Sequence, residues 1–213
     1  MNKCIIGCDE VGRGPIAGPV VGCSLKLKLN NKSDLYLKNL GVTDSKKISV
    51  KKRKLILSSL GIDTLKLKVN QLYEVELEGT SFCFSLASVS EKQIDKINIL
   101  NASLLAMKKA TLKLNPIDED ILIDGNKVFE IKGYKGRINS LIKGDSKSLA
   151  IGLASIIAKD FRDEKMIKLD LKYPGYGFSK HAGYPTKSHR EAVVKLGASK
   201  IHRRSFKGVK EYC

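Results

Sequence analysis

Residues 4–15 read CIIGCDEVGRGP, and this stretch sets the start of the predicted fold. An apolar run that ends in two carboxylates predicts a buried strand over residues 3–9. A second strand is predicted over 15–29, because its end alternates Leu with Lys as a half-buried strand does. The glycine-rich link between them is short, so we predict that the two strands form an antiparallel hairpin.

The remainder of the chain alternates helical and strand-like patterns. Ser49 is placed to cap a basic helix over 50–60, and Ser90 with Gln93 predicts a capping box for a helix that ends before Pro116. The other predicted elements are strands over 65–69, 120–124 and 138–142, a long helix from 146 to about 171, and a helix over 187–196. This order predicts an α/β fold in which helices flank a mixed sheet.

The chain is strongly basic. Its 39 Lys and Arg residues outnumber 22 Asp and Glu residues and give a formal net charge of +17. Many of the basic residues fall in two clusters, at 46–54 and 195–210. Lysines also cover ordinary solvated surfaces, but two concentrated clusters favour a surface that binds a polyanion such as a nucleic acid.

Neither a membrane span nor a secretory signal is predicted. No apolar stretch approaches the ~20 residues of a spanning helix, and acidic residues follow the N-terminus too soon for a signal peptide. The five cysteines are odd in number and lack the spacing of zinc ligands, so we interpret them as reduced, mostly buried thiols. These features predict a cytoplasmic protein with no membrane partner.

Four carboxylates stand out against the basic background. Asp9 and Glu10 end the first predicted strand, Asp124 ends the strand over 120–124, and Asp145 opens the long helix. Each alone is also typical of a turn or a helix cap. Together they suggest a metal pocket, because hard divalent cations prefer carboxylate oxygens. Such a cluster repels itself, so we expect the metal-free site to be poorly ordered or partly protonated.

The sequence motifs around these carboxylates recur in one known family. They are DEVGRGPIAGPVV at 9–21, DSKK at 44–47, DGN at 124–126, KGDSK at 143–147, ASIIAK at 154–159, YPGYG at 173–177, GYPT at 183–186 and HRRSF at 202–206. In this order, and over nearly the whole chain, they resemble the ribonuclease HII family. The related ribonuclease HIII type has Gly-Lys-Gly in place of Gly12-Arg13-Gly14 and an additional N-terminal domain, for which a signature that begins at residue 9 leaves no room.

The resemblance implies a ribonuclease H-like mixed sheet flanked by helices. It implies a catalytic domain over 1–172 and a small helical and loop extension over 173–213 that packs on this domain and contributes to substrate binding. A monomer is expected. The chain ends at Cys213, shortly after Phe206, so no clamp-binding peptide is expected to follow.

The resemblance also implies roles for particular residues. Asp9, Glu10, Asp124 and Asp145 match the family's metal-binding and catalytic carboxylates, which use two Mg²⁺ or Mn²⁺ ions about 4 Å apart. Gly12, Arg13 and Gly14 match a loop whose main chain senses a ribose 2′-hydroxyl, and Tyr184 matches a tyrosine that stacks on a sugar. The remaining substrate contacts are expected from Ser45, Lys46, Lys47 and Asn126.

The implied activity is an endoribonuclease that cleaves the RNA strand of RNA–DNA hybrids. It would also cut 5′ of a single ribonucleotide in duplex DNA, leaving 3′-hydroxyl and 5′-phosphate ends. Two alternatives stay open: a DNA resolvase or nuclease of the same fold, and a basic protein that binds nucleic acid without cleaving it. The first does not explain the Gly12–Gly14 loop with Tyr184, and the second does not explain four acids within a basic surface.

Overall fold

The computed structural model describes residues 4–28, 30–42, 48–77 and 80–213. Its centre is a mixed sheet of six strands in the order β3-β4-β2-β1-β5-β6. The strands are β1 (Cys4–Val11), β2 (Val20–Lys28), β3 (Leu72–Leu77), β4 (Thr80–Val89), β5 (Asp120–Asp124) and β6 (Ile138–Leu141). Neighbours from β3 to β1 are antiparallel, whereas β5 is parallel to β1 and β6 is parallel to β5.

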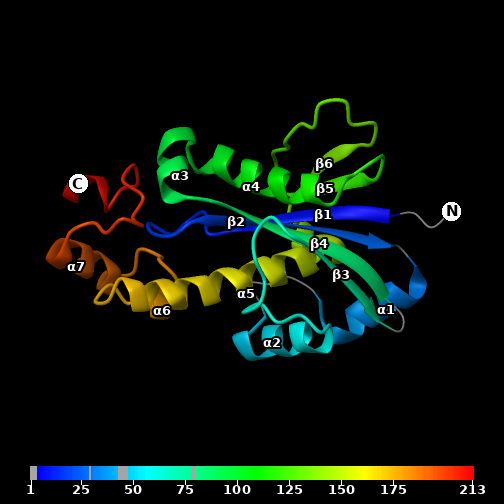
Figure 1. Cartoon of the computed structure of the whole chain (residues 1–213), viewed down its shortest axis with the longest axis horizontal. Helices are drawn as coiled ribbons and strands as arrows, with labels where there is room; N and C mark the ends of the chain where they lie inside the picture. Colours follow the sequence, from blue (N-terminus) through cyan, green and yellow to red (C-terminus); the bar gives the residue numbers. More distant parts are fainter. Residues whose placement is uncertain (1–3, 29, 43–47, 78–79) are drawn as a thin grey trace.

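Helices cover both faces of this sheet (Figure 1). One face carries α3 (Glu91–Ile97) and α4 (Ile99–Lys113), and the other carries α1 (Asn31–Leu40), α2 (Val50–Ser59) and α5 (Leu149–Lys172). Leu25 and Leu153 belong to the apolar cluster between the sheet and α5. Ile6 and Met107 belong to the cluster between the sheet and α4. The sheet is therefore buried on both faces, as expected for an α/β fold.

Several predicted elements are confirmed. The first two strands form the antiparallel hairpin, in which Val11 lies opposite Val21. The strands over 120–124 and 138–142 are β5 and β6, and the helix over 187–196 is α7 (Lys187–Leu196). Ser49 caps α2, since its side chain accepts a hydrogen bond of 3.2 Å from the Lys52 N–H. Local patterns were sufficient for these elements.

The predicted strand over 65–69 is wrong. That segment forms turns, and the strand is β3, which begins at Leu72. The sequence pattern also did not indicate α1 or the central strand β4. β4 is buried along most of its length but includes serines such as Ser85, so it shows neither clean alternation nor a continuous apolar run. Pairing with β2 and β3 outweighs its weak local signal.

The helix predicted to end before Pro116 is two helices. Asn98 has a φ of 62°, which ends α3, and its side chain then caps α4 by accepting 3.0 Å from the Asn101 N–H. The capping box at Ser90 is wrong, because the Ser90 side chain makes no cap hydrogen bond. The long helix begins at Leu149 rather than 146, since a 3₁₀ turn, η1 (Gly144–Ser146), precedes it.

The C-terminal residues form α6 (Phe178–His181), α7 and a last turn, η2 (Lys210–Tyr212). Phe178 and Val193 pack in one apolar cluster with Ala17, which follows β1, and with Met166 of α5. The expected division at 172/173 stays a prediction. Among the described residues, no helix is both long and apolar enough to cross a membrane.

Candidate active site

Asp9 and Asp124 lie side by side on two neighbouring central strands, close to the strand ends. β1 and β5 run parallel with Cys8 opposite Ile123, so the next residue of each strand is one of these carboxylates. Both side chains point away from Cys8 and Ile123, which pack toward α4, because side chains alternate along a strand. The pair therefore faces α5.

A close approach of α5 buries Asp9. Gly7 lies on the same strand face, and a β-carbon there would come within 2.4 Å of the Ala150 carbonyl carbon. The N-terminal half of α5 can pack against β1 only because this side chain is missing. Asp9 is consequently only 6% exposed, and the Ser155 side chain from α5 hydrogen-bonds to it.

Burial raises the pKa of the Asp9 carboxyl well above its ordinary value. The negative charges of Glu10 and Asp124 raise it further, whereas the hydrogen bond from Ser155 acts in the opposite direction. The shift agrees with the expectation that a metal-free cluster of carboxylates retains protons.

Asp145 is brought to the same region by the turn before α5. Lys143 has a φ of 56°, which turns the chain, and the Gly144 N–H then donates 2.7 Å to Oδ1 of Asp124. Asp145 follows directly and is 7% exposed. The hydrogen bond at Gly144 thus ties Asp124 to the turn that carries Asp145.

Glu10 starts on the opposite face of β1 from Asp9. Its Oε1 lies 3.4 Å from an Nη of Arg13, while its main-chain N–H donates 2.8 Å to Oδ1 of Asp9. Within the described ranges, no three His, Cys, Asp or Glu side chains already form a group able to hold a metal ion. The structure therefore brings Asp9 and Asp124 together, whereas Glu10 and Asp145 border this pair.

The Gly12–Gly14 loop leaves β1 directly after these carboxylates and contacts Tyr184. A β-carbon on Gly14 would lie 3.2 Å from Cε1 of the Tyr184 ring. The Tyr184 segment is tied to the loop by main-chain hydrogen bonding, since the Ile16 N–H donates 2.9 Å to the Gly183 carbonyl. Tyr184 is 41% exposed, so one side of its ring remains available to a ligand.

The other predicted substrate residues are less closely defined. Asn126 is exposed in the bend after β5, and Gly125 before it donates 3.1 Å to the Leu141 carbonyl. Asn126 therefore follows Asp124 at the same strand end. Ser45, Lys46 and Lys47 lie outside the described residues.

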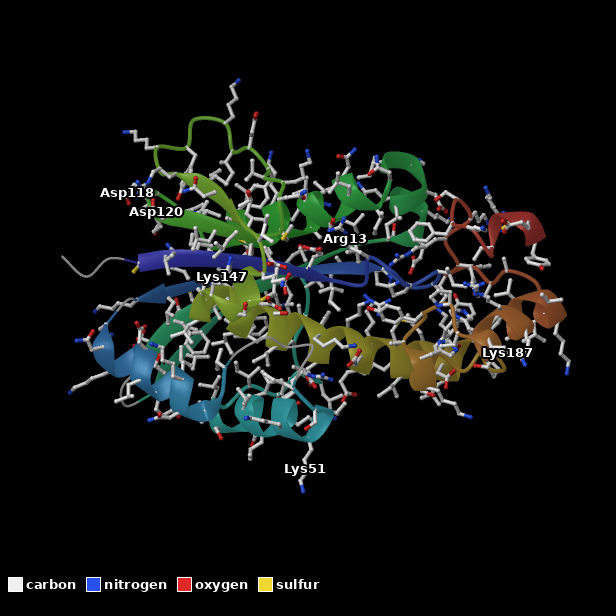
Figure 2. All side chains as sticks on the ribbon, turned by 180° about the vertical axis from the view of Figure 1, so that it is seen from behind. Arg13, Lys51, Asp118, Asp120, Lys147 and Lys187 are labelled. Carbon is white, nitrogen blue, oxygen red and sulfur yellow. The ribbon has the colours of Figure 1, made fainter. Side chains whose placement is uncertain are left out.

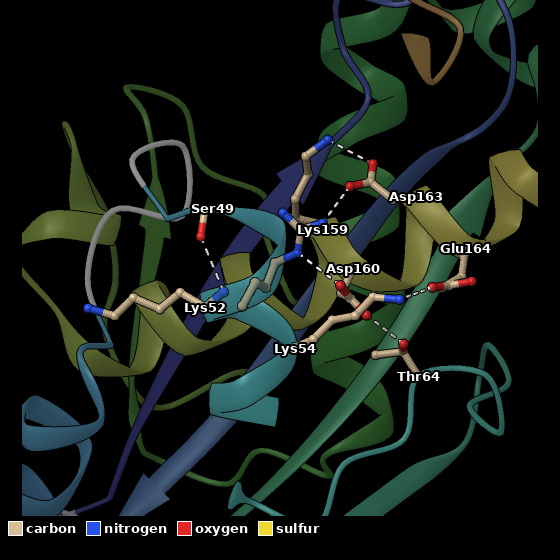
Figure 3. A network of polar contacts seen from close by, with 9 residues as sticks. Ser49, Lys52, Lys54, Thr64, Lys159, Asp160, Asp163 and Glu164 are labelled. Carbon is tan, nitrogen blue, oxygen red and sulfur yellow. Dashed lines mark hydrogen bonds and ion pairs between the residues drawn. The ribbon is translucent and has the colours of Figure 1, made fainter. Parts of the chain in front are cut away.

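The prediction that both basic clusters face a polyanion is wrong for three of their members. Arg53 is buried between α2 and α5, where its Nε lies 3.0 Å from Asp160 and an Nη lies 2.7 Å from Asp163. Figure 3 shows these acids of α5 within a polar network that also includes Lys54 and Glu164. His202 and Arg203 are buried as well.

Two arginines that sequence reasoning did not assign to the site support the Gly12–Gly14 loop. Arg203 and Arg162 are both fully buried, and both donate to carbonyl oxygens between residues 12 and 19. Arg203 stands in the HRRSF motif, which was a signal of importance, but its position in a basic cluster indicated a surface residue. Arg162 stands in α5 without any local signal.

Three histidines pack together beside the segment that contains Tyr184. His189 Nδ1 lies 2.8 Å from the Tyr184 carbonyl oxygen, and its Nε2 lies 3.1 Å from His202 Nε2. His181 stacks on His189 with ring centroids 4.3 Å apart. Burial lowers the pKa of both His189 and His202 to about 4, so both rings are neutral near pH 7 and serve as packing and hydrogen-bonding groups.

Comparison with known proteins assigns the chain to a family. The family model described as Ribonuclease HII matches residues 6–209. A ribonuclease HII of Chloroherpeton thalassium is 41% identical over 207 residues, which cover 95% of this chain and 89% of that relative. A ribonuclease HII of Aliivibrio fischeri is 42% identical over 204 residues, which cover 96% and 86%.

Solved structures confirm the fold. The ribonuclease H2 of Pyrococcus horikoshii OT3 matches with a TM-score of 0.68 and 26% identity, covering 98% of this chain and 96% of that chain. The ribonuclease HII of Archaeoglobus fulgidus, solved in complex with PCNA, matches with a TM-score of 0.71 at 24% identity over 95% of each chain, and supports the fold alone. The chain therefore belongs to the ribonuclease HII family, whose members are ribonuclease H-type endoribonucleases acting on RNA–DNA hybrids.

Proposed function

We propose that the carboxylates near the end of β1 form the catalytic centre of this endoribonuclease and that the Gly12–Gly14 loop with Tyr184 selects the ribonucleotide. The observation that carries this proposal is the continuity of the two features. Asp9 is the third residue before Gly12 in the chain, and the loop returns to contact Tyr184 through Gly14. A sugar held at the loop would thus place its neighbouring phosphate toward the carboxylates.

The donor set fits Mg²⁺ or Mn²⁺. Mg²⁺ commonly takes only one or two protein carboxylates and completes its shell with water and substrate phosphate. Asp9 and Asp124 supply such a pair, and the raised pKa of Asp9 indicates a position at which a cation would relieve repulsion. Glu10 and Asp145 border the pair and would complete the site by rotating toward it.

Two such ions, when bound, would activate the attacking water and stabilise the leaving 3′ oxygen. The protein residues position the reactants around them. The Gly144 N–H holds one oxygen of Asp124, and the other oxygen would serve as the metal ligand. Ser155 orients Asp9 in the same manner. These contacts hold the carboxylates before substrate arrives, which avoids part of the ordering cost during catalysis.

The Gly12–Gly14 loop would read a single 2′-hydroxyl. Glycines permit the main chain to approach a sugar closely, and the main-chain groups can then hydrogen-bond to the hydroxyl. The exposed face of Tyr184 would stack on the adjacent sugar. We therefore propose that one ribonucleotide within duplex DNA suffices, and that cleavage occurs on its 5′ side.

Exposed basic residues would bind the phosphates of the duplex. Among the described Lys and Arg residues of the two basic clusters, those that remain exposed are Lys51, Lys52, Lys54, Lys195, Lys200, Arg204, Lys207 and Lys210. Figure 2 shows Lys51 and Lys187 extending from α2 and α7 at the periphery, while Arg13 lies near the middle of the molecule. Such residues would supply the sequence-independent part of duplex binding.

A duplex with one internal ribonucleotide tests the proposal. With Mg²⁺ or Mn²⁺ present, the protein should cut it once, immediately 5′ of the ribonucleotide, and should leave the same duplex of DNA only intact. Cleavage of branched DNA without ribonucleotides would favour the resolvase alternative. Binding without any cleavage in either metal would favour the non-catalytic alternative.

The five cysteines are all free thiols, and Cys8 and Cys23 are fully buried. Reduced thiols are typical of the cytoplasm, which supports the predicted location. A chain that repairs or degrades RNA–DNA hybrids would also meet its substrate there.

A further inference from the structure

The Gly12–Gly14 loop is closed on itself by one buried side chain. Arg203 donates through Nη2 to the Gly12 carbonyl at 2.6 Å and through Nη1 to the Arg13 carbonyl at 3.0 Å. It also donates to the Gly18 carbonyl at 3.0 Å from Nε and 2.8 Å from Nη. A single guanidinium therefore connects the Gly12–Gly14 loop with Gly18, just before β2.

A second buried arginine ties the loop to the Tyr184 segment. Arg162 donates to Pro19 at 3.0 Å and Ala17 at 3.2 Å, and its remaining Nη donates 2.9 Å to the carbonyl of Ala182. Ala182 lies two residues before Tyr184. Arg162 thus ties the chain that follows the glycine loop to the segment that carries Tyr184.

This arrangement is costly for folding. Burial lowers the pKa of Arg203 to about 9 and that of Arg162 to about 10, which shows how strongly their charges are desolvated. Neither guanidinium forms an ion pair with a carboxylate in the described part of the chain. Apolar replacements are often at least as stable as buried charges, so the two arginines are better explained by the geometry that they impose.

The carbonyl contacts decide where the loop's N–H groups point. In a trans peptide the N–H is directed opposite to the C=O. Since Arg203 binds the carbonyls of Gly12 and Arg13 from inside, the N–H groups of Arg13 and Gly14 are directed away from it. Among the described residues, neither N–H has a main-chain acceptor, so both remain available to a ligand.

We propose that Arg203, supported by Arg162, is a positioning residue that sets ribonucleotide selectivity by holding the Gly12–Gly14 peptides with their N–H groups directed at the 2′-hydroxyl. This inference rests on the proposed function of the loop. It assigns Arg203 no contact with substrate, in contrast to the phosphate contact that its basic neighbours suggest.

Arg203→Lys provides the test, because lysine keeps the charge but cannot bind three carbonyls with a rigid planar fork. In the active enzyme, we expect kcat/KM on the one-ribonucleotide duplex to fall by about 100-fold, since small misplacements of that kind are expensive. In an Asp124→Asn background, which permits binding without cleavage, the preference for the ribonucleotide duplex over the DNA-only duplex should shrink toward one. The affinity for the DNA-only duplex should stay within about twofold, because the phosphate contacts are unchanged.

Arg53→Lys is the matched control. Arg53 is also a buried arginine, but it contacts Asp160 and Asp163 rather than the loop. The Arg53→Lys variant should lower the melting temperature about as much as Arg203→Lys does. It should leave both kcat/KM and the preference for the ribonucleotide duplex unaltered. If Arg53→Lys reduces the preference as much as Arg203→Lys does, the effect is general loss of stability and the inference is overturned.

A folded Arg203→Lys protein that keeps its preference and its kcat/KM would also overturn the inference. If Arg203→Lys does not fold by circular dichroism, Arg162→Lys carries the same test, because it loosens the loop from the Ala182 side. Absence of any ribonucleotide preference in the unaltered enzyme would instead contradict the proposed function of the loop itself.

Discussion

Gly14 and the ring of Tyr184 are packed so closely that a β-carbon on Gly14 would lie 3.2 Å from Cε1 of the ring. Tyr184 is nevertheless 41% exposed, and it belongs to a segment more than 160 positions further along the chain. Gly14 therefore packs directly against the ring, and only a residue without a side chain allows this approach. The accessible part of the ring is left to contact a ligand.

Gly14→Ala should therefore impair ribonucleotide cleavage without unfolding the protein. The added methyl group would displace the Tyr184 ring by a few tenths of an ångström, and Gly14 does not have a positive φ that would strain an alanine. We expect a loss of about 10-fold or more in kcat/KM on the one-ribonucleotide duplex, with a melting temperature near that of the unaltered protein.

Gly12→Ala is the informative contrast. Gly12 has a φ of 95°, and a β-carbon there would come within 2.3 Å of Nε of Arg162. This variant should lose stability, whereas Gly14→Ala should lose activity. Equal melting temperatures for the two variants would contradict the different packing of the two glycines.

The carboxylate pair could be predicted from the sequence because its signal is local. Asp9 and Asp124 each end a short apolar run, and such runs in an α/β fold form central strands whose ends meet at one edge. Neither β4 nor α1 carries a comparable pattern. In β4, the serines that pack between helices and sheet look like loop residues until the neighbouring strands are present.

Burial of Arg203 and Arg162 could not be predicted, because it too leaves no local pattern in the sequence. A sequence shows that Arg203 has basic neighbours, but its partners are carbonyl oxygens of residues 12, 13 and 18, nearly the whole chain away. Carbonyl groups are present at every position and therefore leave no sequence signal. The loop and its support become recognisable as one unit only once β1, α5 and the C-terminal segment are folded together.

Asp124→Asn should abolish cleavage while preserving binding. Asparagine can still accept the hydrogen bond from the Gly144 N–H, so the turn that carries Asp145 should keep its shape. Removal of one negative charge weakens the metal site but not the attraction between basic residues and phosphates. Cleavage assays at saturating Mg²⁺ and Mn²⁺, with duplex affinity measured at one fixed salt concentration, check both parts.

Full cleavage by Asp124→Asn at high metal concentration would remove Asp124 from the proposed catalytic set. Asp170→Asn is a suitable control at a distant position. Asp170 accepts a hydrogen bond of 2.7 Å from the Phe178 N–H near the end of α5, and its replacement should leave cleavage unchanged.

Acid should loosen the segment that carries Tyr184. Burial lowers the pKa of His189 and His202 to about 4, whereas an unfolded histidine titrates near 6.5. Between these values the unfolded chain binds more protons than the native state, so the free energy of unfolding should fall as the pH drops from about 6.5 toward 4. Urea denaturation at several pH values measures this slope.

His189→Asn should make that slope shallower, since only His202 would then contribute. His189 also stacks on His181 and lies beside the carbonyl of Tyr184. Its protonation would place a positive charge beside neighbours that do not all stabilise a positive charge. An identical pH dependence in the variant and the unaltered protein would assign the acid sensitivity to other groups.

Asp9→Asn should stabilise the metal-free protein while removing its response to metal. Burial, and then the charges of Glu10 and Asp124, raise the native pKa of Asp9, so the native state holds a proton that the unfolded chain releases near pH 3.9. The contribution of Asp9 to the free energy of unfolding of the metal-free protein should therefore fall as the pH rises above about 3.9, opposite in sign to that of the histidines. At pH 8 with a chelator, Asp9→Asn should melt at a higher temperature than the unaltered protein, and the difference should shrink near pH 4.

Adding Mn²⁺ should reverse the order of the two melting temperatures. A ligand at 100 times its Kd stabilises the native state by about 2.7 kcal/mol, and only the unaltered protein has the complete site. If Asp9→Asn melts at a lower temperature than the unaltered protein at pH 8 with a chelator, the Asp9 carboxylate is stabilised in its charged form by a partner. It is then not destabilised by the neighbouring negative charges.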